Sequence, residues 1–267
     1  MIKVDTYRAV AEAEASMDGQ SRYMGGGTLV MRDLNYGSYG FERLVRCTDP
    51  RLNSVRRDRG RIVIGAGLTM AECAENRDLA FLAAPAMGVG GPAVRNMATV
   101  GGNLFAPPPF GDFATAMLAL DARVRTAGGE ELGIEALLAS RRTFRRIVTE
   151  IEFLPPPRGG FRFRKVSRVK PKGVSVLSIC ALLPQSGGRI RGARIAFNGM
   201  GATPLRATGS EAALEGRPLD RNGIAPALDA ALQGLSPADD ELATSWYRRT
   251  VAPVYLRRML LERSHAY

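Results

Sequence analysis

The sequence predicts a protein of the α+β class, with two mixed βα subdomains followed by a C-terminal three-stranded antiparallel sheet with helices. Two observations predict this class. Up to residue 153, short runs rich in β-branched residues alternate with helical patterns. Beyond the prolines at 155–157, which are typical of a linker, three strand patterns follow one another and helical patterns come after them. We therefore expect an N-terminal subdomain at 1–54, a second subdomain at 55–157 and a C-terminal domain at 158–267.

The N-terminal subdomain contains the first of two glycine-rich loops. The pattern at 7–17 predicts a helix that stops at Gly19, and a short strand at 21–24 leads into Gly25-Gly-Gly-Thr28. Consecutive glycines after a strand can place backbone N–H groups around a phosphate, although such loops are often only turns. A further strand is expected at 41–46.

The stretch 61–76 imitates a dinucleotide-binding fingerprint. A strand pattern of β-branched residues comes directly before Gly65-x-Gly67, as in that fingerprint. However, Met70 occupies the third glycine position, and no acidic residue follows at the spacing that ribose binding requires. We therefore reject a Rossmann motif and assign these glycines to a tight strand-to-helix turn. Thr69-x-x-Glu72 is a capping box, which starts a helix that ends at about Asn76.

The second glycine-rich loop, within residues 88–112, carries most of the functional prediction. Its sharpest part is Thr99-Val-Gly-Gly-Asn103, where two glycines can reach φ > 0 and expose N–H groups between neutral polar side chains. Apolar residues at spacing i, i+3, i+4 and i+7 then predict a helix over 113–120, with Asp112 near its start. Asp112 is either a plain N-cap or a ligand-binding carboxylate, and the sequence leaves both open.

The remaining elements follow from periodicity and from breakers. In the second subdomain we expect a strand at 122–126, a helix at 134–139 and a strand at 146–153. In the C-terminal domain we expect strands at 161–168, 173–183 and 189–197, then helices at 210–215, 225–233 and 245–263. Pro253 predicts a kink or break near Ala252 in the last helix.

Several classes of chemistry lack their usual residues. The single histidine, His265, is the third residue from the end of the sequence, and Cys47, Cys73 and Cys180 form no CxxC pair. This pattern argues against metal-dependent hydrolysis, a histidine-activated nucleophile, a disulfide framework and an iron–sulfur site within this chain. A bound cofactor is therefore expected to carry any catalytic chemistry. No apolar run of transmembrane length and no signal-peptide pattern is visible, so we expect a cytoplasmic location.

The net charge of +11 is unevenly distributed. Residues 141–172 contain eleven Arg or Lys against Glu150 and Glu152. This basic stripe could bind nucleic acid, an acidic partner subunit or a cofactor diphosphate, or it could be the solvated face of strands.

In their order, these motifs resemble a known family, the FAD-binding (medium) subunits of the molybdenum hydroxylases, such as those of xanthine dehydrogenase and carbon monoxide dehydrogenase. The resemblance covers nearly the full chain. It depends on Gly25–Thr28, on Gly90–Asn103 with Asp112 nine residues later, and on three later segments, Phe163–Arg168, Thr203–Arg206 and Tyr247–Arg249.

The resemblance implies a PCMH-type FAD-binding fold of three subdomains, with FAD held between the first two and covered by the third. It implies that backbone N–H groups of both glycine loops hold the diphosphate, that Asp112 bonds the cofactor, and that Lys165, or Arg164 beside it, approaches the flavin. The cofactor-binding residues implied are Gly25, Gly26, Gly27, Thr28, Leu29, Thr99, Val100, Gly101, Gly102, Asn103, Asp112 and Lys165.

The function implied is that of an electron-transfer oxidoreductase subunit that works only within a complex. A small iron–sulfur subunit with [2Fe-2S] clusters and a large molybdopterin subunit would supply the electrons, which FAD would pass to an external acceptor. Two alternatives stay open. Leu29 and the apolar segment 105–109 replace polar residues common in the family, which would suit a flavin-free scaffold subunit. The basic stripe would suit a nucleic-acid-binding protein.

Overall fold

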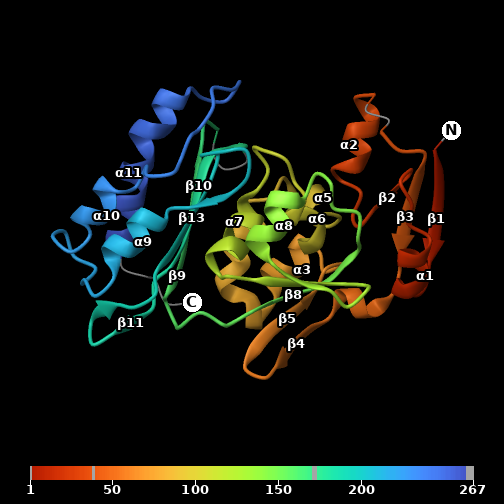
Figure 1. Ribbon diagram of the computed structural model, residues 1–267, viewed down its shortest axis with the longest axis horizontal. Coiled ribbons are helices and arrows are strands. Elements are labelled where there is room, and N and C mark those ends of the chain that lie inside the picture. Colours follow the sequence, from red (N-terminus) through yellow and green to blue (C-terminus); the bar gives the residue numbers. More distant parts are fainter. Residues whose placement is uncertain (1, 38–39, 170–172, 263–267) are drawn as a thin grey trace.

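The computed structural model describes residues 2–37, 40–169 and 173–262, and therefore not His265, Lys170 or Lys172. Three parts lie side by side along the long axis of the molecule (Figure 1), with the N-terminal part at one end and the C-terminal part at the other. Within the described ranges, no helix combines the length and the apolar character needed to cross a membrane. The same ranges contain no group of three or more His, Cys, Asp or Glu side chains arranged to hold a metal ion.

The N-terminal part is a small parallel sheet with two helices. Its strands lie in the order β1-β3-β2, and Lys3 and Ser21 both pair with Arg43. The strand β1 was not predicted, and the first helix begins at Val10 rather than at residue 7, because residues 3–7 pair along the whole length of β3. The elements are β1 Lys3–Tyr7, α1 Val10–Ala15, β2 Ser21–Tyr23, α2 Val30–Asn35 and β3 Arg43–Cys47.

The middle part is a five-stranded sheet with helices packed against one face (Figure 1). Every strand pair in the order β4-β5-β8-β6-β7 is antiparallel, so the parallel βαβ unit of a Rossmann fold is absent from this sheet, as predicted. The strands are β4 Val55–Asp58, β5 Arg61–Gly65, β6 Arg123–Thr126, β7 Glu131–Gly133 and β8 Val148–Phe153. The helices are η1 Pro50–Asn53, α3 Met70–Glu75, η2 Arg77–Leu82, α4 Ala83–Met87, α5 Pro92–Arg95, α6 Val100–Leu104, α7 Asp112–Ala119 and α8 Ile134–Ser140.

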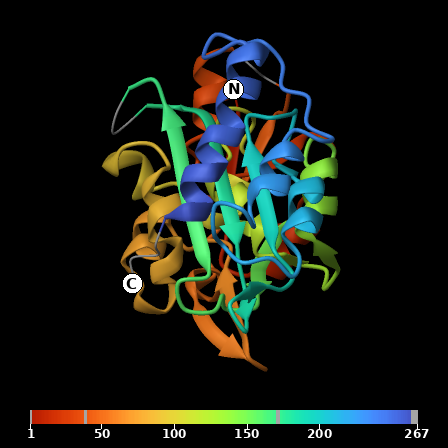
Figure 2. The ribbon, with the colours of Figure 1, turned by 90° about the vertical axis from the view of Figure 1, so that its left-hand side faces the viewer.

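The C-terminal part is an antiparallel sheet of order β14-β13-β10-β9, so a fourth, two-residue strand joins the three that were predicted. Figure 2 shows its three helices lying across the face of the sheet that points away from the middle part. The predicted strand at 189–197 is divided in two, with Gly192 at φ +68° between the halves. The elements are β9 Phe161–Ser167, β10 Ser175–Leu182, β11 Gln185–Ser186, β12 Arg189–Ile190, β13 Arg194–Asn198, β14 Leu205–Arg206, α9 Thr208–Leu214, α10 Ala225–Asp229 and α11 Ser245–Leu261.

Helix α7 joins the middle and C-terminal parts. All eight of its residues are buried, because it packs against α4 and α6 on one side and against β10 and β13 on the other. Its Phe113 and Met117 belong to a core that also contains Ile151 of β8 and Cys180 of β10. Apart from Asp112 and Thr115 the helix is apolar, which suits a position between two sheets.

Helix α11 continues through Pro253 as one helix, so of the two predicted outcomes near Ala252, a kink or a break, the break does not occur. Proline removes one backbone hydrogen bond from a helix. Here Ala252, Leu256, Met259 and Leu260 are buried under the helix, and this packing keeps the turns on both sides of Pro253 in place.

Candidate functional site

The two glycine-rich loops lie in contact, although about seventy residues of sequence separate them. A Cβ atom on Gly25 would lie 2.8 Å from Thr99 Oγ1, and one on Gly26 would collide with the carbonyl group of Met97. The absence of side chains at these two positions is therefore what allows the first loop to lie against the second.

The first loop offers an uninterrupted series of backbone donors. No N–H group from Gly25 to Leu29 donates a hydrogen bond to any residue in the described ranges. Gly27 has φ +75°, a conformation that glycine adopts without steric cost. Since unpaired backbone N–H groups attract an anion, this loop has the donors that a diphosphate requires.

The second loop behaves differently from the prediction. Residues 100–104 form the short helix α6, and neither of its glycines has a positive φ. Its N–H groups are already occupied: those of Val100 and Gly101 donate to Leu68 O and Ala66 O, and those of Gly102 and Asn103 donate to Thr99 Oγ1 and Thr99 O. The prediction that this segment exposes its amides is wrong for residues 100–103, because tertiary partners and the Thr99 cap satisfy them.

Close packing against Ala66 explains why residue 101 is a glycine. A Cβ there would lie 2.7 Å from Ala66 Cβ and 2.8 Å from Ala66 O, at the end of β5. At Gly102 the Thr99 hydroxyl is the one neighbour within 4 Å of such an atom among the described residues. The first glycine of the pair therefore allows α6 to approach β5, and the second does not have this role.

Asn103 carries an unexplained polar atom. Its side chain is only 7% exposed, and its Oδ1 is buried with no hydrogen-bond partner in the described part of the chain. Buried polar atoms are almost always paired, so an orphaned one next to a candidate site indicates a partner that the protein alone does not provide.

Asp112 is not an N-cap. Gly111 caps α7, and the Asp112 carboxylate accepts hydrogen bonds from Ser175 Oγ at 2.7 Å and Ser178 Oγ at 2.7 Å. Lys165 Nζ lies 3.0 Å from Asp112 Oδ2 and also donates to Gly88 O at 2.8 Å. These partners come from β9 and β10, so the carboxylate fastens α7 to the C-terminal sheet.

Sequence reasoning missed Ser175 and Ser178. Residues three apart in a regular strand point to opposite faces, so the pair gives no pattern. The register of β10 against β9 shifts between Ser175 and Leu177, and this bulge turns both hydroxyls toward Asp112. Two serines within an otherwise apolar, buried strand are the one signal that the sequence offered.

Several side chains of the basic stripe at 141–172 make contacts within the molecule. Arg141 donates to Ala106 O and Ala202 O, and burial lowers the pKa of its guanidinium. Arg146 pairs with Glu14 of α1, and Arg164 pairs with Glu262. Arg162 donates to two carbonyl groups in the last turn of α11. Arg141 and Arg146 thereby join different parts of the chain. The rest of the described stripe includes exposed arginines at positions 142, 145, 158 and 168.

The two buried cysteines have no nucleophilic role. Cys73 and Cys180 are free thiols, as predicted. Burial raises the pKa of Cys73 to about 12 and that of Cys180 well above its ordinary value. Both therefore remain protonated near neutral pH.

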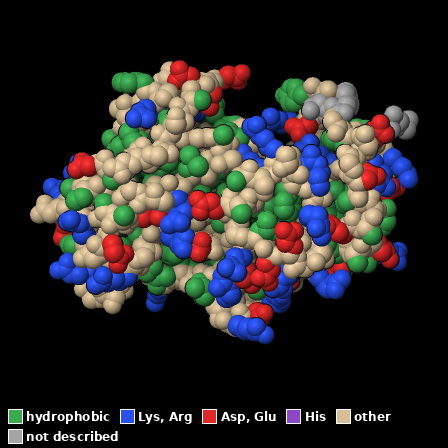
Figure 3. Space-filling view, viewed as in Figure 1, with side chains coloured by type: hydrophobic (Ala, Val, Ile, Leu, Met, Phe, Trp, Pro, Cys, Tyr) green, Lys and Arg blue, Asp and Glu red, His purple; other side chains and the backbone are tan. Residues whose placement is uncertain are grey.

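The outer edge of the site is formed by α2 and by the proline-rich loop that precedes α7. The Arg32 guanidinium lies 4.8 Å from the centre of the Phe110 ring. Figure 3 shows the outline of the molecule dipping between the C-terminal part and the end that carries α2. The free amides, the orphaned Asn103 oxygen and this hollow together suit an elongated, phosphate-bearing cofactor.

The chain matches two family models. Residues 1–155 match the FAD binding domain in molybdopterin dehydrogenase, and residues 162–263 match the CO dehydrogenase flavoprotein C-terminal domain.

Known proteins with similar sequences belong to the same family. The chain is 28% identical to the 6-hydroxypseudooxynicotine dehydrogenase complex subunit alpha of Paenarthrobacter nicotinovorans, over 81% of this chain and 77% of that protein. It is 26% identical to the carbon monoxide dehydrogenase medium chain of Hydrogenophaga pseudoflava, over 79% of this chain and 77% of the relative.

Chains of solved dehydrogenase structures have the same fold as this chain. A chain of the carbon monoxide dehydrogenase from Hydrogenophaga pseudoflava superposes with a TM-score of 0.87 at 24% identity, covering 97% of this chain and 96% of that one. The predicted α+β, PCMH-type architecture is therefore confirmed.

FAD is the cofactor of the matched family, and the free amides and the orphaned Asn103 oxygen fit it. This chain belongs to the FAD-binding medium subunits of the molybdenum hydroxylases and is an oxidoreductase subunit.

Proposed function

We propose that this chain holds FAD where its N-terminal and middle parts meet and passes electrons through it to an external acceptor within a molybdenum hydroxylase complex. The observation that carries the proposal is the run of five backbone N–H groups, Gly25 to Leu29, without partners in the described ranges and in contact with the second loop.

In this proposal the first loop provides the diphosphate contacts. Its N–H groups and the neighbouring Thr99 and Asn103 side chains bind and orient the cofactor. These contacts do not depend on a polar side chain at position 29, because the backbone donates them. The replacement of polar family residues by Leu29 and by segment 105–109 is therefore compatible with cofactor binding, and no observation favours a flavin-free scaffold.

Lys165 has an indirect role in this proposal. Its ammonium is held by Asp112 and by the Gly88 carbonyl, so it keeps the C-terminal sheet in place over the second loop. Bound FAD supplies the capacity to accept and release electrons one or two at a time. The residues of this chain bind it, orient it and exclude water around it.

The proposal includes partner subunits as the source of the electrons. The described residues contain no cluster of metal-ligating side chains, and the three cysteines of the sequence are far apart. We propose that a small iron–sulfur subunit and a large molybdopterin subunit complete the complex. The relatives named above are a subunit of a dehydrogenase complex and a medium chain.

The test is an absorption spectrum of the purified chain, followed by mass identification of the compound released by heat. We expect a flavin spectrum, FAD at close to one equivalent, and no substrate oxidation without the other subunits. A purified, folded chain that neither retains FAD nor takes it up when FAD is added would contradict the proposal, and so would full turnover by this chain alone.

A further inference from the structure

We propose that the outward face of α11 is a docking surface for an acidic, partly apolar protein surface on a partner subunit. This inference rests on the proposed function, because it requires that the chain works in a complex. It adds the location of one interface and the chemistry of the surface that meets it.

The helix presents two different faces. Its inner face packs on β9 and β10, and Figure 2 shows the helix lying across that sheet. Its outer face leaves large side chains in solvent: Trp246 is 72% exposed and Val254 is 45% exposed. Tyr247 is 38% exposed, and Leu261 is half-buried at the far end. Tryptophan and arginine are the residue types that most often carry the energy of protein–protein binding.

Within the helix the charged side chains have one sign, and Glu262 just after it pairs with Arg164. From Ser245 to Leu261 the helix has four arginines and no acidic residue. Arg248 is buried and paired with Asp240, so it does not contribute to the outer face. Arg249, Arg257 and Arg258 are exposed and form no salt bridge with any residue in the described ranges. In the stripe at 141–172, by contrast, Arg141 and Arg162 bond carbonyl groups within the molecule.

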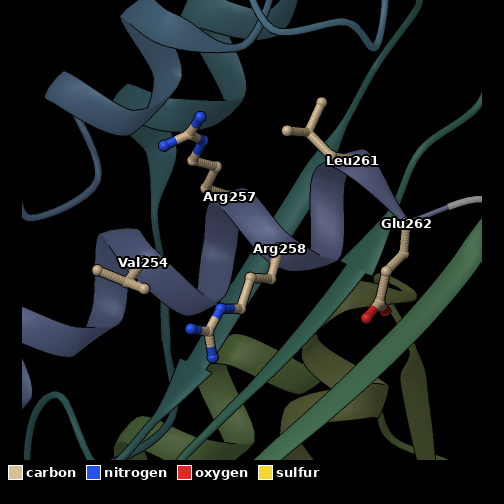
Figure 4. A pocket seen from close by; sticks show the side chains of 5 residues that line it. All are labelled: Val254, Arg257, Arg258, Leu261 and Glu262. Carbon is tan, nitrogen blue, oxygen red and sulfur yellow. The ribbon is translucent and has the colours of Figure 1, made fainter.

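The last turns of α11 also form a concavity. A pocket of about 460 Å³ is lined by Val254, Arg257, Arg258, Leu261 and Glu262. Figure 4 shows these side chains leaving the helix, with Arg257 and Leu261 on one side of it and Arg258 and Glu262 on the other. The Arg258 guanidinium lies 5.1 Å from the centre of the Tyr255 ring, which helps to hold it in position.

The combination favours a protein partner over a nucleic acid. Val254 and Leu261 add apolar atoms to the same pocket as the two arginines, as expected for a surface that receives a protein side chain flanked by carboxylates. Nucleic-acid surfaces instead need a longer basic track than the three exposed arginines of this helix provide. Since the chain carries +11 overall, an acidic partner would also be attracted over long range.

The experiment uses the complex isolated from its own cells through a tag on this chain, identified by its subunit masses and its molybdenum content. The charge reversal Arg257→Glu with Arg258→Glu is compared with Arg57→Glu and Arg59→Glu in the β4–β5 hairpin, which has the same charge change on another part of the molecule. Flavin content and circular dichroism verify that both variants are folded. We expect the α11 variant to bind the remaining subunits about tenfold more weakly or worse, and the hairpin variant to bind within about twofold of the unmodified chain.

A second readout uses Trp246, which is the only tryptophan of the chain. The chain is labelled with 5-fluorotryptophan and mixed with the unlabelled remainder of the complex, so that its fluorine signal reports on this helix. We expect the signal to shift on assembly and to lose accessibility to a soluble quencher. The inference is overturned if assembly leaves Trp246 accessible and the α11 variant binds as well as the unmodified chain. It is equally overturned if a 30-nucleotide DNA binds this face and competes with the partner subunits.

The experiment separates failure of the docking surface from failure of the proposed function. A chain that retains FAD and enters the complex normally with α11 reversed refutes this surface alone. A chain that never enters a complex refutes both.

Discussion

At the scale of single residues, replacing Asn103 tests whether its unpaired oxygen binds the cofactor or stabilises the protein. Asn103→Leu keeps the size of the side chain and removes the unpaired atom. We expect FAD affinity to fall by about tenfold, the value of one lost hydrogen bond. We also expect the cofactor-free protein to unfold at an equal or higher temperature, because a buried polar atom without a partner is removed. Fluorescence titration with FAD and thermal unfolding measure the two effects. A less stable cofactor-free protein with unchanged FAD affinity would contradict a ligand role.

Gly26 tests the contact between the loops. Gly26→Ala adds a Cβ that collides with the Met97 carbonyl, and this pushes the first loop away from the second. We expect the purified variant to lose most of its flavin while it remains folded, as measured by the ratio of flavin to protein absorbance after gel filtration. Gly91→Ala is the matched control, because a Cβ there meets nothing within 4 Å among the described residues. Equal flavin content in the two variants would show that the loops need not touch for binding.

At the scale of elements, the two glycines of α6 have different roles that the sequence alone does not distinguish. Gly101 and Gly102 are adjacent and chemically identical, but only the first faces Ala66. We expect Gly101→Ala to destabilise the protein by about 1–3 kcal/mol through overpacking, and Gly102→Ala to be near neutral or slightly stabilising in a helix. Urea unfolding of the two variants measures this difference. Equal stability would mean that α6 does not depend on its close approach to β5.

Helices and strands were predicted best where their signal is local. The capping box Thr69-x-x-Glu72 is present and starts α3 as expected. The apolar spacing correctly placed α7 at Asp112–Ala119. The strand β1 could not be predicted in the same way, because exposed and half-buried residues alternate weakly in it and it is held by pairing with β3, forty residues away.

At the scale of the whole molecule, the buried pair of Asp112 and Lys165 joins the middle and C-terminal parts. We expect Asp112→Ala to lower the free energy of unfolding by about 3 kcal/mol, because it leaves the Lys165 ammonium largely buried without its carboxylate. The double variant Asp112→Asn with Lys165→Met should lose less than the sum of its two single changes. Denaturant unfolding of all four proteins, with FAD affinity measured in parallel, completes the cycle. Strict additivity would contradict the coupling of Asp112 and Lys165. A loss of FAD affinity without a loss of stability would instead indicate that Asp112 contacts the cofactor.

The sequence by itself determined the α+β class, the rejection of a Rossmann motif, the absence of a cysteine cluster and the order of motifs that indicates a flavin-binding subunit. These are properties of composition, local spacing and short-range hydrogen bonding. Only the tertiary structure decided that the amides of residues 25–29 are free while those of 100–103 are occupied, and that Asp112 bonds Ser175 and Ser178. It also decided that Arg141 and Arg162 bond carbonyl groups within the molecule while Arg257 and Arg258 of α11 are exposed. The reason is physical: whether a donor, a carboxylate or a guanidinium is available to a ligand depends on which distant segments the packing brings against it.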